Sequence, residues 1–241
     1  MATTVGIFAE SGQGKTTSIV VNPDSKCVYL YDGHPKKAEE YEGIDPKSTV
    51  IINADKKALP FPSDDKWVLN KNVFWETDVN KIKDLLLNAN KYDHIKTIFI
   101  DTLNGIMIDK EMNDIRKKSY DKWADLAQQI YDLISFCNST LREDIVVYFG
   151  GHVTTYTDVD GNESKCLITN GRKLEKIKLE TKLPVVLFCS VDRGVNGEHE
   201  YRFETQANRS TGKTPLGMFK DFLIPNSLKL VDDTIREYYG I

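Results

Sequence analysis

Short apolar runs alternate with amphipathic segments along most of this chain. Uninterrupted apolar runs predict strands that are buried in a sheet covered on both faces. These runs lie at residues 3–8, 26–32, 48–54, 96–101 and 144–151. Segments with helical spacing of apolar residues lie between them, at 15–21, 79–89 and 123–137. The alternation predicts an α/β fold with a mostly parallel, doubly wound sheet and right-handed crossovers.

The pattern changes after residue 152. A β-hairpin is predicted around Asp160 and Gly161, because this pair is typical of tight turns between strands. A short basic helix at 172–182 and two strands at 184–191 and 200–206, expected to be antiparallel, follow it. The sequence contains no internal repeat, low-complexity tract or evident linker, so residues 1–241 are predicted to form a single domain.

Composition narrows the class of protein. The formal net charge of −4 argues against a uniformly basic nucleic-acid binder, although it leaves a local basic face open. The four cysteines are far apart and include no CxxC pair, which is typical of reduced thiols in the cytoplasm. The N-terminal segment lacks the features of a signal peptide, and no apolar run is long enough to span a bilayer. We therefore expect a soluble cytoplasmic protein with no membrane partner.

The segment AESGQGKT, residues 9–16, matches the phosphate-loop pattern GxxxxGK[ST] except that Ala9 replaces the first glycine. In this motif backbone N–H groups surround the phosphates, the lysine contacts the β and γ oxygens, and the hydroxyl binds Mg²⁺. The predicted helix from Lys15 would direct its N-terminus at the phosphates. The alternative is a glycine-rich turn without a ligand. Residues predicted to bind ATP are Ala9, Glu10, Ser11, Gly12, Gln13, Gly14, Lys15, Thr16 and Thr17.

A carboxylate is needed across the sheet to complete the Mg²⁺ site. Asp101 stands at the end of the apolar run TIFID, where ligands bind in open α/β sheets. This Walker B arrangement predicts that Asp101 and Thr16 hold Mg²⁺, with Thr102 as a further hydroxyl nearby. The alternative role for Asp101 is the N-cap of the next helix.

The group that activates water is less clearly indicated. Asp32 follows the second apolar run and is a candidate general base, although a turn residue before Gly33 would have the same pattern. Glu76 is a rival candidate. His152 follows the strand 144–151 at the edge where it could sense the γ-phosphate, but a lone histidine can equally be structural.

Four segments together resemble the RecA-like branch of P-loop ATPases: ESGQGKTT, VYLYDGH, IFIDT and the strand ending GGH. The segment 201–219, YRFETQANRSTGKTPLGMF, is similar to one in phage-encoded AAA-type ATPases related to single-strand-annealing recombination proteins. The resemblance extends from about residue 3 to 222. It implies a RecA-like core, ATP hydrolysis in phage DNA recombination within the host cytoplasm, and a homo-oligomer that forms a ring or filament. The chain has no room for the additional N-terminal domain of full recombinases, so a minimal core ATPase is expected.

The resemblance also implies roles for basic residues. Lys213, and less directly Arg209, would approach the γ-phosphate of a neighbouring subunit; without the resemblance, a solvated charged loop is as good an interpretation. Single-stranded DNA would bind after the strand that ends at His152, with Tyr156 stacking on bases. A solvated hairpin and helix is the alternative. The residues expected to contact DNA phosphates are Arg172, Lys173, Lys176 and Lys178.

Three functions are compatible with these features. The first is a DNA-dependent recombination ATPase that assembles on single strands. The second is a nucleotide-gated interaction or structural protein with negligible turnover. The third, a small-molecule phosphotransferase, requires clustered arginines to clamp an acceptor phosphate, and the arginines here are scattered.

Overall fold

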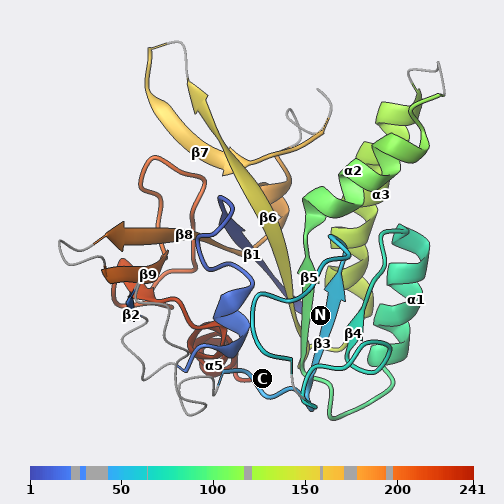
Figure 1. The fold of residues 1–241 in the computed structure, drawn as a ribbon, viewed down its shortest axis with the longest axis horizontal. Helices are drawn as coiled ribbons and strands as arrows, with labels where there is room; N and C mark the ends of the chain where they lie inside the picture. The colour runs from blue at the N-terminus through green and yellow to red at the C-terminus, as the bar shows by residue number, and fades with distance from the viewer. Residues whose placement is uncertain are drawn as a thin grey trace.

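The computed structural model describes the chain except residues 23–27, 31–42, 64, 117–120, 158–159, 171–177 and 194–197. Its central feature is one large sheet (Figure 1). The strands are β1 (Thr3–Ala9), β2 (Val28–Leu30), β3 (Thr49–Asn53), β4 (Val73–Phe74), β5 (Thr97–Asp101), β6 (Val146–Thr157), β7 (Glu163–Leu167), β8 (Val185–Arg193), β9 (Glu198–Glu204) and β10 (Leu223–Pro225). The predicted strands at 3–8, 48–54, 96–101 and 144–151 are confirmed as β1, β3, β5 and the first part of β6.

The strand order along the sheet is β10-β9-β8-β1-β6-β5-β3-β4, with β2 paired to β9 and β7 paired to β6. From β8 to β4 along this order each strand is parallel to the next, whereas β9 is antiparallel to β8 and β10 is antiparallel to β9. β6 and β7 form the predicted hairpin, which extends away from the sheet at the top of Figure 1. This arrangement confirms the expected fold class, an α/β fold with a mostly parallel sheet, a β-hairpin and antiparallel C-terminal strands.

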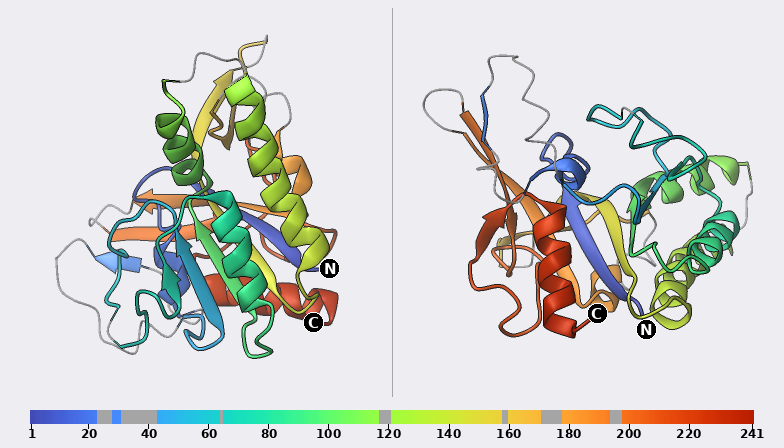
Figure 2. Two further views of the ribbon diagram at one scale, coloured as in Figure 1. Left: turned by 90° about the vertical axis from the view of Figure 1, so that its right-hand side faces the viewer. Right: turned by 90° about the horizontal axis from the view of Figure 1, so that it is seen from below.

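Helices cover both faces of the sheet (Figure 2). One apolar core lies beneath α1, α2 and α3, and a second lies between the opposite face and α5 with η1. Successive residues of a buried strand therefore enter different cores: Ile51 of β3 packs into the second core and Ile52 into the first. The helices are η1 (Thr17–Val20), α1 (Val79–Ala89), α2 (Leu103–Asn113), α3 (Asp121–Thr140), η3 (Leu179–Lys182) and α5 (Leu228–Tyr239).

Two helix predictions need correction or restriction. The helix expected at 15–21 is a single 3₁₀ turn, η1, because Val21 already has an extended backbone and the residue before Pro23 is disfavoured in a helix. A turn this short contributes no appreciable helix dipole to the phosphate loop. Of the basic helix expected at 172–182, residues 172–177 lie outside the described part, and Leu179–Lys182 form a 3₁₀ turn.

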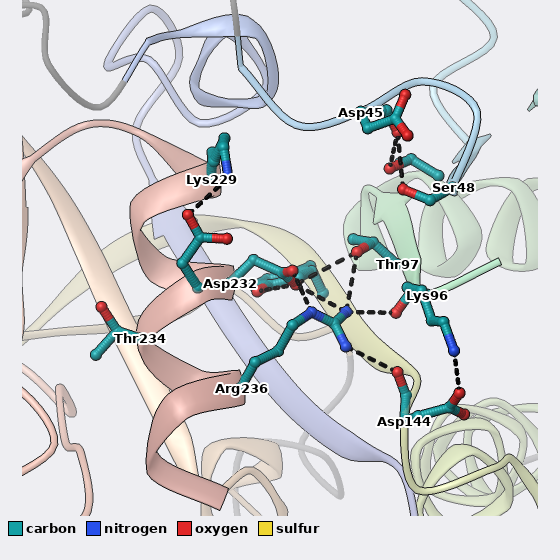
Figure 3. Close-up of polar contacts among 12 residues, drawn as sticks. Asp45, Ser48, Lys96, Thr97, Asp144, Lys229, Asp232, Thr234 and Arg236 are labelled. Atoms are coloured by element: carbon teal, nitrogen blue, oxygen red, sulfur yellow. Dashed lines mark hydrogen bonds and ion pairs between the residues drawn. The ribbon is translucent and has the colours of Figure 1, made fainter. Parts of the chain in front are cut away.

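The C-terminal helix α5, which the sequence analysis did not anticipate, is fixed to the sheet by a buried polar cluster (Figure 3). The Arg236 guanidinium donates to the Asp232 carboxylate at 2.6 Å and to the backbone carbonyls of Lys96 and Asp144 at 2.8 Å each. The Tyr148 hydroxyl from β6 donates to the same carboxylate at 2.9 Å. These contacts join α5 to the N-terminal ends of β5 and β6, whereas the phosphate loop follows the C-terminal end of the parallel strand β1.

Candidate functional site

The phosphate loop follows directly from β1. Ala9 is still part of that strand, so its extended backbone does not require the glycine that the motif usually has. Gly12 and Gly14 have left-handed φ angles of 80° and 85°, where a side chain is strained. A Cβ on Gly14 would also lie 2.8 Å from Asn226 Oδ1 and 2.9 Å from Tyr201 Cδ1. The loop is therefore shaped by its own glycines and by the C-terminal segment that packs behind it.

A cavity of about 490 Å³ opens at this loop. Among the predicted nucleotide-binding residues, all from Glu10 to Thr17 except Gln13 line it. Gln13 instead accepts the backbone N–H of Glu10 at 3.2 Å and so helps to close the loop. The rest of the lining is Lys57, Ala58, Pro60, His152, Tyr201 and Asn226. The cavity is thus formed by segments that lie far apart in the sequence.

The buried Asp101 lies against two of the residues that line this cavity, Lys15 and Thr16. The Thr16 hydroxyl donates to Asp101 Oδ2 at 2.7 Å, and Lys15 Nζ lies 4.0 Å from Asp101 Oδ1. Burial lowers the pKa of the Lys15 ammonium and raises the pKa of the Asp101 carboxyl, and the attraction between the two groups opposes both shifts. Both shifts disfavour the charged forms, so an anion bound beside Lys15 and a cation bound beside Asp101 would oppose them.

The residues present fit Mg²⁺ bound together with a nucleotide. Asp101 Oδ1 is buried and accepts no hydrogen bond from the described residues, so it has a lone pair available. A Cβ on Gly150 would lie 3.0 Å from this oxygen, and the glycine keeps the space open. Within the described part of the chain no group of three His, Cys, Asp or Glu side chains is arranged for a metal. Phosphate and water oxygens would therefore complete a shell begun by a hydroxyl and a carboxylate, as Mg²⁺ prefers.

The N-cap of α2 is Thr102 and not Asp101. The Thr102 hydroxyl accepts the Gly105 N–H at 3.0 Å and donates to Asp55 Oδ1 at 2.9 Å. The helix is thus capped without Asp101, whose carboxylate faces Thr16 and Lys15. Its role as a Mg²⁺ ligand remains a prediction that this geometry favours.

Asp55 and Lys57 are site residues that the sequence analysis missed. The backbone N–H of Ala54 donates to the Asp101 carbonyl at 2.6 Å, which places the turn after β3 beside the end of β5. Lys57 Nζ lies 2.7 Å from Asp55 Oδ2. Partial burial acts to raise the pKa of Asp55, but the hydrogen bonds from Lys57 and Thr102 outweigh it and hold that pKa below its usual value. The available signal was an acidic residue directly after an apolar run, the same signal that identified Asp101.

The three candidates for activating water have different surroundings. His152 is the register partner of Ala9 and lines the cavity, and burial followed by repulsion from Lys15 lowers its pKa. Glu76 does not line the cavity; its carboxylate accepts the backbone N–H groups of the next two residues at 2.9 and 3.0 Å, at the start of α1. Asp32 lies outside the described residues. Only His152 of the three is therefore placed at the phosphate loop by the structure.

The proposed trans-acting cations lie on the segment between β9 and β10. The backbone of Lys213 forms a two-way bridge with Val186 of β8, at 2.8 and 3.0 Å. Arg209 has a left-handed φ of 48°, and its carbonyl accepts the Lys165 N–H at 2.7 Å. Neither residue lines the cavity of its own chain. Their action on a neighbouring subunit remains a prediction.

The predicted DNA-contacting residues are only partly described. Tyr156 lies on β6 in the protruding hairpin with 58% of its surface exposed, as a base-stacking residue requires. Lys178 and Tyr156 both line a second cavity, of about 600 Å³, beneath the hairpin. Arg172, Lys173 and Lys176 lie outside the described residues. None of the described helices is both long and apolar enough to cross a bilayer.

Comparison with known proteins adds little to this picture. No protein-family model matches the chain, and no curated protein matches it in sequence. Among solved structures, it is similar to the KaiC-like protein PH0186 from the hyperthermophilic archaeon Pyrococcus horikoshii OT3, with 14% identity and a TM-score of 0.43. The match covers 83% of this chain and 76% of that one. The fold class assigned above therefore rests on the strand order and the phosphate loop.

Proposed function

We propose that this protein binds Mg²⁺·ATP and hydrolyses it. The observation that carries the proposal is the contact of the buried Asp101 with two residues that line the cavity: the Thr16 hydroxyl is 2.7 Å from its carboxylate, and Lys15 Nζ lies 4.0 Å from the same carboxylate. A glycine-rich turn without a ligand has no need to bury a lysine there, because burial disfavours its charge. A polyphosphate supplies the missing negative charge.

Each group of the loop has a distinct role in this proposal. Backbone N–H groups between Glu10 and Thr16 bind phosphate oxygens, and the Lys15 ammonium neutralises the terminal phosphates. Thr16 and Asp101 would hold Mg²⁺, which when bound supplies a positive charge to the phosphate oxygens during transfer. The Thr16–Asp101 hydrogen bond holds both ligands in position before the metal arrives.

We assign the general base to Asp55, which does not itself line the cavity but pairs at 2.7 Å with Lys57, which does. Its carboxylate is half-buried beside Asp101, Lys15 and Lys57, and its lowered pKa keeps it ionised at neutral pH. An ionised carboxylate near the terminal phosphate can orient a water molecule and accept its proton on an Oδ atom. His152, which is uncharged at neutral pH because burial lowers its pKa, is suited to a hydrogen bond with the γ-phosphate. Glu76 is engaged at α1 and is the weaker candidate.

We further propose that the ATPase assembles on single-stranded DNA and acts in recombination. Support comes from the resemblance in residues 201–219 and from the exposed Tyr156 on a hairpin that projects from the sheet beyond the core. The position of Lys213, away from its own cavity, is compatible with contact to the nucleotide of another copy. Hydrolysis would then depend on assembly, because a trans-acting cation completes the site.

The experiment is ATP hydrolysis by the purified protein with and without single-stranded DNA, beside Lys15→Ala. We expect hydrolysis that DNA stimulates and that the substitution lowers by roughly 100-fold or more, the scale on which a group that stabilises transition-state charge acts. Tight ATP binding without hydrolysis in either condition would instead support a nucleotide-gated binding protein. Phosphate transfer to an added small acceptor would support the phosphotransferase. Hydrolysis that Lys15→Ala leaves unchanged would exclude this site as its source.

A further inference from the structure

The turn after β3 brings a second lysine to the cavity. The Asn53 amide donates to the Lys57 carbonyl at 2.6 Å, and the left-handed φ of 52° at Lys56 turns the chain between them. As a result, adjacent lysines face different surroundings. Lys57 lines the cavity and pairs with Asp55 at 2.7 Å, whereas Lys56 Nζ lies 3.9 Å from Asp109 on α2, away from the cavity.

Asp55 does not line the cavity, but it pairs with Lys57, which does, so its negative charge bears on a bound triphosphate. Asp101 faces Thr16 and Lys15 and is suited to a metal, so its charge is compensated when Mg²⁺ binds. Asp55 is held by Thr102 and Lys57 instead. If Lys57 remained its partner, one Asp55 oxygen would be unavailable to water. If no cation were near, the carboxylate and the terminal phosphate would repel each other.

We propose that Lys57 is a cis-acting ligand of the terminal phosphate, and that it exchanges Asp55 for this phosphate when a nucleoside triphosphate binds. The exchange makes no covalent bond. The ammonium gives up its hydrogen bond to Asp55 Oδ2 and donates one to a phosphate oxygen, and its charge stays between the carboxylate and the phosphate. Asp55 Oδ2 becomes available to water, while Thr102 keeps the carboxylate in place through Oδ1. This inference rests on the proposed ATP-binding function.

The surroundings of the pair suit such an exchange. The Lys57 side chain is 60% exposed while that of Asp55 is only 15% exposed, so the cation is free to move and the anion is fixed. Only the Lys57 partner of this pair is exposed, and a charge-assisted contact of its ammonium with phosphate can offset the loss of the contact with Asp55. A lysine is also suited to the role, because its charge is a point on a long flexible stem. A diphosphate lacks the phosphate that would draw Lys57 away.

The test is calorimetric titration of Lys57→Gln with Mg²⁺·ADP and with Mg²⁺ and a non-hydrolysable ATP analogue. Lys56→Gln is the matched control, since it removes the adjacent charge outside the cavity. We expect Lys57→Gln to weaken binding of the analogue about tenfold, as expected for loss of one charge-assisted hydrogen bond, and to leave ADP binding within about twofold. Lys57→Arg should restore most of the difference, and Lys56→Gln should change neither affinity.

The outcomes separate this inference from the proposed function. If Lys57→Gln weakens the analogue and ADP equally, or changes neither, Lys57 does not contact the terminal phosphate and the exchange is refuted. If Lys56→Gln weakens binding of the ATP analogue as much as Lys57→Gln does, while ADP binding is retained, the inference is also refuted. The overall positive charge of this turn would then explain the effect. If the wild-type protein binds neither nucleotide, the proposed function itself fails, whatever the variants do.

Discussion

Replacing Arg236 by methionine should strongly lower the free energy of unfolding, because the buried carboxylate of Asp232 then loses its cation. In the native structure the Arg236 side chain is 19% exposed and that of Asp232 only 8%, and their polar atoms are 2.6 Å apart (Figure 3). Methionine keeps much of the apolar stem but removes the charge and the donors to two backbone carbonyls. Asp232 then keeps the Tyr148 hydroxyl at 2.9 Å and the Thr97 hydroxyl at 3.3 Å, but no cation.

Helix α5 contains two ion pairs of the same spacing, one buried and one exposed, so the loss of stability expected from breaking the buried pair can be compared with a control. Removing one partner of a buried ion pair costs about 3–5 kcal/mol, because the remaining charge is uncompensated in a medium that solvates it poorly. Lys229 and Asp233 form an ion pair of the same spacing on α5, with side chains 40% and 56% exposed. Breaking an exposed pair costs about 0–1 kcal/mol. Arg236→Met should therefore lower the free energy of unfolding by several times the loss in Lys229→Met.

The pH dependence provides a second signature. Burial raises the pKa of Asp232 in the folded protein, and Arg236 opposes that shift. Without Arg236 the folded-state pKa rises further above the unfolded value, so the folded state binds more protons than the unfolded state between the two values. Stability then increases as pH falls through that interval. The deficit of Arg236→Met relative to wild type should be largest at pH 7 and smaller at pH 5.

Urea unfolding followed by circular dichroism at both pH values measures these differences. Asp232→Asn combined with Arg236→Met should recover part of the loss, because no buried charge remains. The reasoning is refuted if Arg236→Met loses no more stability than Lys229→Met, or if its deficit grows on acidification.

Two further predictions concern the candidate site. Gly14→Ala should abolish nucleotide binding in the calorimetric titration, while the circular dichroism spectrum stays that of the native protein. The reason is that Gly14 has a left-handed backbone and an added Cβ would lie 2.8 Å from Asn226 Oδ1 and 2.9 Å from Tyr201 Cδ1. Binding at wild-type affinity would show that the loop adapts to the added methyl group. Asp55→Asn should lower the ATP hydrolysis rate by about 10²–10⁴-fold with analogue affinity retained, the usual contribution of a general base, whereas Glu76→Gln should leave it nearly unchanged. The reverse ranking of these two variants would return the role to Glu76.

Much of the core could be predicted from the sequence because its signals are local. The strands β1, β3 and β5 each have an apolar interior, and strands buried on both faces of a sheet typically have this pattern. The phosphate loop is equally local, since Lys15 and Thr16 follow the glycines directly and the motif includes its own anion-binding groups. The length of the next helix was overestimated, because apolar spacing did not show that Val21 would already be extended.

The remainder of the site required the tertiary structure. Asp55 and Lys57 lie in a charged segment that resembles an ordinary solvated loop, and only the pairing of β3 with β5 places them beside Asp101. Asn226 comes to the phosphate loop from the other end of the chain, and α5 is fixed through contacts to strands far away in sequence. The sequence by itself thus determined the central strands β1, β3 and β5 and the phosphate loop, since hydrophobic periodicity and loop chemistry act over a few residues. Which charges lie next to Asp101 and the phosphate loop was decided by the tertiary structure, because Coulomb interactions depend on distances that only the complete sheet establishes.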